Sequence, residues 1–152
     1  MNRTRKPRVP AIFVANHQER VPLDLPRLEQ LLPAAWEAVV QEAPGPADTL
    51  LPELEELEVS ILSDEEISRQ HEAFLGDPSP TDVITFQHGE LLISADTAAR
   101  ESRSRAQPLE RELLLYLLHG LLHLHGFGDQ SIAERSQMHA IQDRLLSQLW
   151  PD

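Results

Sequence analysis

The chain has 152 residues, of which 41% are hydrophobic, and a formal net charge of −12 at pH 7. This length suits one compact domain, which we expect to span residues 1–152 with a flexible tail at residues 1–8. Because there is no cysteine, disulfides and thiolate zinc sites are excluded, and any metal must bind His, Asp or Glu. Apolar runs are too short for a membrane span or a signal peptide, so we expect a cytoplasmic protein.

The first third of the chain is predicted to form a strand, a helix and a loop. Residues 10–16 are typical of a strand. Residues 24–42 have the pattern of an amphipathic helix, with Asp24 as its N-cap and Pro33 expected to kink or shorten it. Proline and glycine then indicate a loop around residues 43–52.

A second strand and a short helix are predicted next. Apolar and polar residues alternate up to Ser63, which indicates a strand over residues 57–63. Ser63 and Glu66 have the spacing of a capping box, which predicts a helix that ends near Phe74. Beyond a loop, residues 81–86 and 90–94 are expected to form two strands joined by a tight turn.

The last third is predicted to be helical, over residues 95–105, 109–125 and 132–149. Pro108 suits the first turn of the middle helix and Gly126 suits its exit. Ser131 and Glu134 form a second capping-box pattern. We therefore predict an α+β fold in which helices cover a small mixed sheet, and the apolar helix 109–125 packs against that sheet.

The charges are unevenly distributed along the chain. Nine acidic residues and no basic one lie between Glu42 and Glu66, which indicates either a solvated face or a docking surface for a basic partner. Arginines gather instead ahead of the later histidines, at Arg100, Arg103, Arg105 and Arg111. Because nucleic acids bind clustered basic side chains, the net charge argues against nucleic-acid binding, whereas this local cluster favours it.

The segment from His119 to Asp129 carries the strongest chemical pattern. His119 and His123 are four residues apart, so on a helix both imidazoles project from one face, as two ligands of one ion must. Gly126 allows a left-handed exit, after which Asp129 can return as a third ligand. Two histidines and one carboxylate leave coordination positions open, which is typical of a catalytic metal site.

Burial supports this hypothesis. The helix is apolar on nearly every side, and buried imidazoles need partners, so the alternative is a pair of core histidines hydrogen-bonded within the protein. His125 points away from the ligand face and is interpreted as a core residue. Glu112 lies two turns before His119 on the same face, where it could carry protons or simply complement the helix dipole.

The ligand spacing matches the metzincin protease signature H-E-x-x-H-x-x-G-x-x-H, including its glycine. Gly120, however, stands where a protease has its catalytic glutamate. Without that general base a working metalloprotease is the weaker hypothesis.

A second family fits the residues better. Residues 119–127 (HGLLHLHGF) resemble the signature H-G-x-L-H-L-x-G-aromatic of the YbeY-type endoribonucleases. Residues 80–86 (PTDVITF) resemble the family's P-T-D-V-L-S-F strand, residues 89–94 (GELLIS) its G-D-I-x-I-S strand, and residues 138–146, more loosely, its closing helix. The sequence thus resembles this family from about Val59 to Leu146.

The resemblance implies a zinc-dependent, single-strand-specific endoribonuclease that matures the 3′ end of small-subunit ribosomal RNA, with His119, His123 and Asp129 binding one Zn²⁺ per chain. It implies ribosomal RNA and small-subunit proteins as partners and no organic cofactor. Asp82 and Thr85 would lie beside the site, where they could position substrate or merely fix the strand edge. Asp82 and Glu112 are therefore the candidate catalytic residues.

The sequence departs from the family pattern at three positions. Most members have His where this chain has Asp129, although Asp also binds zinc. Leu75 replaces a usual arginine and His71 a usual asparagine. Three arginines could compensate as substrate-binding residues, or they could belong to a solvated helix face with a Glu101 to Arg105 pair; they are Arg100, Arg103 and Arg105. A non-catalytic ribosome assembly factor with a structural metal is the alternative, and the acidic charge favours it.

Overall fold

The computed structural model describes residues 8–77, 79 and 81–151, so the predicted tail lies outside the described residues except for Arg8. Its strands form one mixed sheet in the order β1 (Ala11–Asn16), β2 (Glu56–Leu62), β4 (Glu90–Ser94) and β3 (Val83–Phe86). The first three of these run parallel, and β3 is antiparallel to β4.

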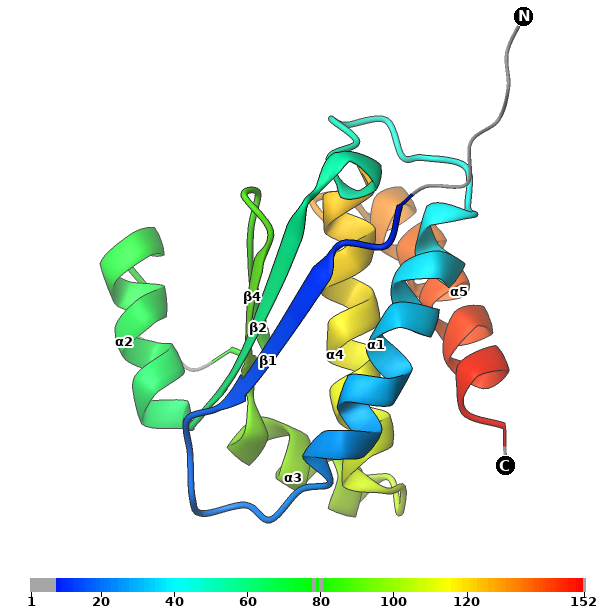
Figure 1. Cartoon of the computed structure of the whole chain (residues 1–152). Coiled ribbons are helices and arrows are strands. Elements are labelled where there is room, and N and C mark those ends of the chain that lie inside the picture. Colours follow the sequence, from blue (N-terminus) through cyan, green and yellow to red (C-terminus); the bar gives the residue numbers. More distant parts are fainter. Residues whose placement is uncertain (1–7, 78, 80, 152) are drawn as a thin grey trace, which may run out of the picture.

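Helices cover both faces of the sheet. They are α1 (Leu25–Val40), α2 (Asp64–Leu75), α3 (Ala95–Ser104), α4 (Leu109–Leu124) and α5 (Ile132–Leu149), with a short 3-10 turn at Leu51–Glu53. Figure 1 shows α1 and α4 on one side of the sheet and α2 on the other. The predicted fold class, a small mixed sheet covered by helices, is confirmed. Among the described residues, no helix has both the length and the apolar character that crossing a membrane requires.

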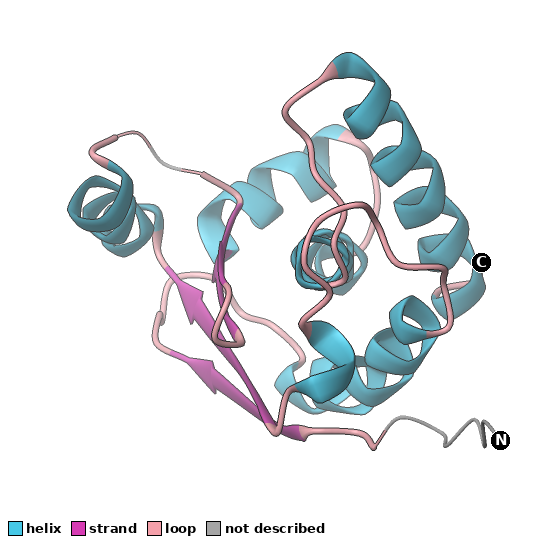
Figure 2. Cartoon of the chain, turned by 90° about the horizontal axis from the view of Figure 1, so that it is seen from above, coloured by secondary structure: helices cyan, strands magenta, loops and turns pink. Residues whose placement is uncertain are grey.

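Helix α4 lies at the centre of the helical layer, where Figure 2 shows it end-on, and it packs against α1, α3, α5, β3 and β4. Ten of its sixteen residues are buried, as expected for a helix that is apolar on nearly every side. A Cβ at Gly120 would lie 2.8 Å from Leu91 Cδ2 and 3.3 Å from Thr85 Oγ1. The glycine therefore allows α4 to approach the sheet closely.

The C-terminal end of α4 is closed by the loop that follows α1. The N–H groups of Gly45, Ala47 and Leu50 donate to the carbonyls of His125, Gly126 and Leu124, at 3.0, 3.0 and 2.9 Å. These bonds satisfy carbonyls that a helix end otherwise leaves unpaired. Gly126 has φ +96°, which confirms the predicted left-handed exit.

Two of the predicted helix starts differ in detail. Pro108 is the N-cap of α4 and lies one residue before its first turn. Ser63 caps α2 by accepting from the Glu66 N–H at 3.2 Å, but the Glu66 carboxylate binds Arg69 instead of closing the box. An arginine three residues away offers a charged partner that the serine N–H cannot match.

The other two predicted caps are confirmed. Asp24 accepts from the Arg27 N–H at 3.2 Å, and the complete capping box of α5 forms between Ser131 and Glu134. Pro33 lies inside α1, which continues to Val40, so of the two predicted effects, a kink or a shortened helix, the shortening at Pro33 does not occur. The buried stripe of α1 on either side of Pro33 offsets the one hydrogen bond that proline removes.

Candidate metal centre

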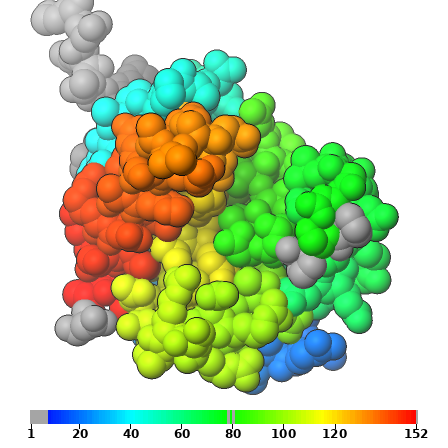
Figure 3. Space-filling model, turned by 180° about the vertical axis from the view of Figure 1, so that it is seen from behind, coloured from blue at the N-terminus to red at the C-terminus, as the bar shows by residue number. Residues whose placement is uncertain are grey.

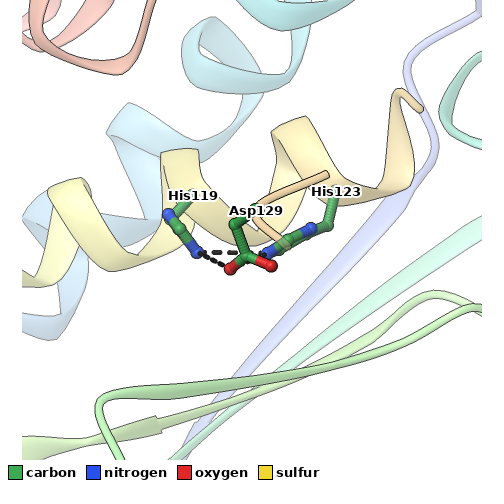
Figure 4. A group of neighbouring side chains, drawn as sticks. All are labelled: His119, His123 and Asp129. Carbon is green, nitrogen blue, oxygen red and sulfur yellow. Dashed lines mark hydrogen bonds and ion pairs between the residues drawn. The ribbon is translucent and has the colours of Figure 1, made fainter. Parts of the chain in front are cut away.

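His119 and His123 occupy the last turns of α4, and Asp129 returns toward them from the loop that follows the helix (Figure 4). The two imidazole Nε2 atoms are 3.1 Å apart. Asp129 Oδ2 lies 3.6 Å from His119 Nε2 and 3.3 Å from His123 Nε2. The spacing seen in the sequence thus brings all three side chains to one point, and within the described residues they form the one group able to hold a metal ion.

The other ring nitrogen of each histidine fixes its tautomer. His123 Nδ1 faces the carbonyl oxygen of Phe127 at 3.1 Å, and His119 Nδ1 faces Gln142 Oε1 at 2.9 Å. Because both partners are acceptors, each Nδ1 carries the hydrogen and donates it. Each Nε2 is therefore left with a lone pair that points toward Asp129.

Three acceptors turned toward one another repel unless a cation lies among them. Tetrahedral ligands about 2.0–2.1 Å from a zinc ion lie about 3.3 Å from each other, close to the 3.1–3.6 Å found here. The side chains of His119, His123 and Asp129 are 20%, 26% and 34% exposed, so one side of the group faces solvent. This arrangement fits a divalent metal with three protein ligands and open positions for water or substrate.

Two cavities meet at this centre. One, of about 490 Å³, is lined by both histidines and Asp129 together with residues of β3. The other, of about 610 Å³, runs from His119 between α3 and α5, and Figure 3 shows α4 (yellow) between these two helices. Thr81, Asp82 and His119 line both cavities.

Asp82 lies at the start of β3, on the wall that the two cavities share. Its Oδ1 accepts from the N–H of Val83 at 2.8 Å, and β3 begins at Val83 and not at Thr81 as predicted. Asp82 lines both cavities next to the candidate metal centre, but it is not one of the three residues that could hold the ion. Thr85 lies against Gly120 on the sheet side of α4.

Glu112 is placed away from the three ligands, two helical turns before His119, and only 1% of it is exposed. Its carboxylate oxygens both lie 3.4 Å from Arg105 Nη1. Burial, and then the charge of Glu112, raises the pKa of the Tyr116 hydroxyl. Glu112 thus lines the larger cavity but is engaged with an arginine.

The three predicted substrate-binding arginines are distributed over two cavities. Arg105 lines the cavity that contains His119, Arg103 lines a separate cavity, and Arg100 lines both. Arg100 is bound to Asp64 at 2.7 Å, and Arg105 lies 3.6 Å from Glu101, the pair that the sequence suggested. Each cavity-facing arginine is therefore already paired with a carboxylate.

Sequence reasoning missed Gln142, the partner of His119. The signal was present, because Gln142 is a polar residue on a stripe of α5 that is otherwise apolar, formed by Met138, Leu145 and Leu146. A buried amide in such a stripe requires a hydrogen-bond partner. His125, in contrast, is buried as predicted, and its Nε2–H donates to the carbonyl of Glu42 at 2.8 Å.

Fold and site together define an α+β protein in which two histidines of a central helix and an aspartate of the following loop form a group able to hold a metal ion. The model of the family "Endoribonuclease YbeY" matches residues 13–150. The chain belongs to this endoribonuclease family, a family of nucleases that hydrolyse RNA, as the sequence resemblance predicted.

Individual relatives agree with this assignment. The chain is 32% identical over 134 residues to the endoribonuclease YbeY of Porphyromonas gingivalis, covering 84% of this chain and 85% of that protein. It is 32% identical over 136 residues to that of Geobacter metallireducens, covering 81% and 83%. The solution structure of TM1509 from Thermotoga maritima is similar with a TM-score of 0.60 and 22% identity, over 92% of this chain and 88% of that one, which supports the fold.

Proposed function

We propose that the chain is a zinc-dependent, single-strand-specific endoribonuclease that acts in the cytoplasm on the 3′ end of small-subunit ribosomal RNA. The observation that carries this proposal is the convergence of His119, His123 and Asp129, with both Nε2 lone pairs aimed at one open point. Membership of the endoribonuclease family supplies the reaction class. Zinc is favoured because imidazole and carboxylate ligands in this geometry suit it.

Different residues of the chain would have different roles in hydrolysis. A bound zinc ion would supply a Lewis acid for the phosphodiester and a means of activating water near neutral pH. The Phe127 carbonyl and Gln142 hold the histidine N–H groups, so that both rings keep their metal-binding tautomer. Asp82, on the wall shared by both cavities, is the better placed of the two candidate catalytic carboxylates to accept a proton from water or substrate.

Glu112 has a different role in this proposal. Because its carboxylate is bound to Arg105 and lies two turns from His119, it would act by holding Arg105 at the wall of the larger cavity. Arg100 and Arg105 would then contact the RNA in this cavity, and Arg103, which does not line it, would contact the RNA only outside it.

The test is cleavage of a labelled single-stranded RNA by the purified chain. We expect cleavage with zinc, loss of cleavage with EDTA, recovery when zinc is restored, and little cleavage of the same sequence in a duplex. The variant His123→Ala should be folded and inactive. Cleavage that survives both EDTA and this substitution would refute the metal-dependent mechanism.

A ribosome assembly factor with little turnover is the second candidate. It is favoured by an acidic surface around the start of β2, where Glu53, Glu55, Glu56 and Glu58 are all exposed. Such a surface suits a basic small-subunit ribosomal protein. If zinc-loaded wild type binds the small subunit but leaves single-stranded RNA intact, this candidate replaces the nuclease.

The metalloprotease hypothesis loses support at Gly120. A Cβ there would lie 2.8 Å from Leu91 Cδ2 and 3.3 Å from Thr85 Oγ1, so a glutamate at position 120 would require these sheet side chains to shift. The metalloprotease hypothesis would be supported again only if the purified chain digested casein and EDTA prevented this digestion.

A further inference from the structure

We infer that Gln142 positions His119 for the metal and, because its amide is uncharged, keeps the centre attractive to an anionic substrate. The first half concerns metal binding alone. The second half rests on the proposed nuclease function. Gln142 is thus a positioning residue that acts through His119.

The geometry ties Gln142 to one ring orientation of His119. The amide is 7% exposed and comes from α5, whereas His119 comes from α4. Its Oε1 accepts the His119 Nδ1–H at 2.9 Å, so the opposite nitrogen keeps its lone pair. A ring without this partner could rotate or carry its hydrogen on Nε2, and either change removes a ligand from the centre.

The position of Gln142 in α5 argues against a purely structural role. It lies on the buried stripe with Met138, Leu145 and Leu146, where an apolar side chain would pack without needing any partner. Burying an amide is unfavourable unless it is hydrogen-bonded, and the bond that Gln142 makes is to a metal-ligating histidine. The burial is therefore explained by the centre and not by the packing of the helices.

The absence of charge on this partner has its own effect. Asp129 is the one carboxylate in the group, so a divalent ion bound there keeps a net positive charge. A carboxylate at position 142 would make His119 a stronger ligand but would cancel charge that draws in a phosphodiester. We conclude that Gln142 favours attraction of substrate over the tightest binding of metal.

The metal-binding half is tested by zinc affinity, measured by competition with a chromogenic chelator at pH 7. We expect Gln142→Leu to bind zinc about 10- to 100-fold more weakly, the range found when a group that orients a ligand is removed. Gln142→Glu, which restores an acceptor, should bind as tightly as wild type or more tightly. Gln148→Leu, on the exposed side of the same helix, is the matched control and should leave affinity unchanged.

Thermal unfolding in EDTA separates positioning from folding, because a positioning role leaves the metal-free protein of both Gln142 variants folded. Wild-type zinc affinity in Gln142→Leu, or weak binding in Gln142→Glu, would overturn the inference.

The charge half is tested with single-stranded RNA at saturating zinc. Gln142→Glu should raise KM about 3- to 10-fold, the effect of one added charge at partly screened distances, and added salt should shrink the difference. An unchanged KM refutes this half alone. If wild type cleaves no RNA, the proposed function fails, while the zinc affinities still decide the positioning of His119.

Discussion

The polar side chains near the two ends of helix α4 find their partners in different ways. Near its N-terminus, Glu112 is paired with Arg105, so the carboxylate finds its countercharge within the chain. Near its C-terminus, His119, His123 and Asp129 turn three acceptors toward one another. A buried group that already has a partner indicates structure, whereas acceptors that converge on a common point indicate a ligand from outside the chain.

His125 sharpens this comparison because it lies on the same helix, just beyond the ligands. Its Nε2–H is bonded to the Glu42 carbonyl, and its ring is more deeply buried than those of His119 and His123. Three histidines within seven residues thus divide into two candidate metal ligands and one core residue. The direction of each ring, and not the residue type, makes the distinction.

The largest effect is expected when a converging histidine is removed. His123→Ala should weaken zinc binding by more than about 100-fold, since a ligand matters more than the groups that orient it. His125→Ala is the matched control: it should lose about 1–3 kcal/mol of stability by leaving a carbonyl unpaired, yet keep one zinc per chain. Elemental analysis and chelator competition measure both. Equal zinc loss in the two variants would mean that the comparison is wrong.

A smaller effect is expected at the loop that closes the C-terminal end of α4. A Cβ at Gly45 would lie 2.2 Å from the carbonyl oxygen of Gly126, so Gly45→Ala should cost about 1–3 kcal/mol in urea unfolding and weaken zinc binding. Gly76→Ala, at φ +71° with open space around it, should also cost about 1 kcal/mol but leave zinc affinity unchanged. Unchanged zinc affinity in Gly45→Ala would show that the loop does not support the centre.

Substitutions at the N-terminal end of α4 should change stability and leave zinc affinity unchanged. Arg105→Ala leaves the Glu112 carboxylate buried without its partner, which should cost about 1–2 kcal/mol, less than for a fully buried pair because Arg105 is half exposed. Arg103→Ala, two residues earlier on the same helix, should change stability by less than about 0.5 kcal/mol. Zinc affinity should stay constant in both. A loss of zinc in Arg105→Ala would show that the N-terminal end of α4 also supports the metal centre.

The smallest effect is expected at Asp64. Its carboxylate binds Arg100, which lines the cavity that contains His119. Burial opposes its ionisation, but hydrogen bonds from Ser94, Arg100 and Thr97 outweigh burial and lower the pKa of the Asp64 carboxyl. Its contribution to stability is therefore present above the unfolded pKa of about 4 and lost as pH falls through the lower folded pKa.

The stability contribution of the Asp64 carboxylate can be measured as the difference in unfolding free energy between wild type and Asp64→Asn in urea. We expect a difference of about 0.5–1 kcal/mol at pH 7 that shrinks below pH of about 4. If the difference in unfolding free energy between wild type and Asp64→Asn is the same at pH 7 and below pH of about 4, the effect is due to packing and not to the charge of Asp64.

The sequence predicted that three candidate ligands would converge, because helical spacing alone determines that His119 and His123 share a face, and a glycine exit allows Asp129 to return. The order of the strands did not follow from periodicity, since pairing depends on contacts between distant segments. The same limit hid Gln142, whose hydrogen bond joins two helices. Which cavity each arginine of α3 lines, with Arg105 in one, Arg103 in another and Arg100 in both, can be stated only once the neighbours of α3 are known.

The loop that closes α4 offers a way to observe the centre from outside it. The amide hydrogens of Gly45, Ala47 and Leu50 are held by carbonyls at the end of the helix that carries both histidines. Their exchange with solvent is therefore limited by local opening of that helix end, and a bound ion that ties His123 to Asp129 opposes this opening. Slower exchange at three amides of a surface loop would then report that the metal is in place, without any change in the amount of regular structure.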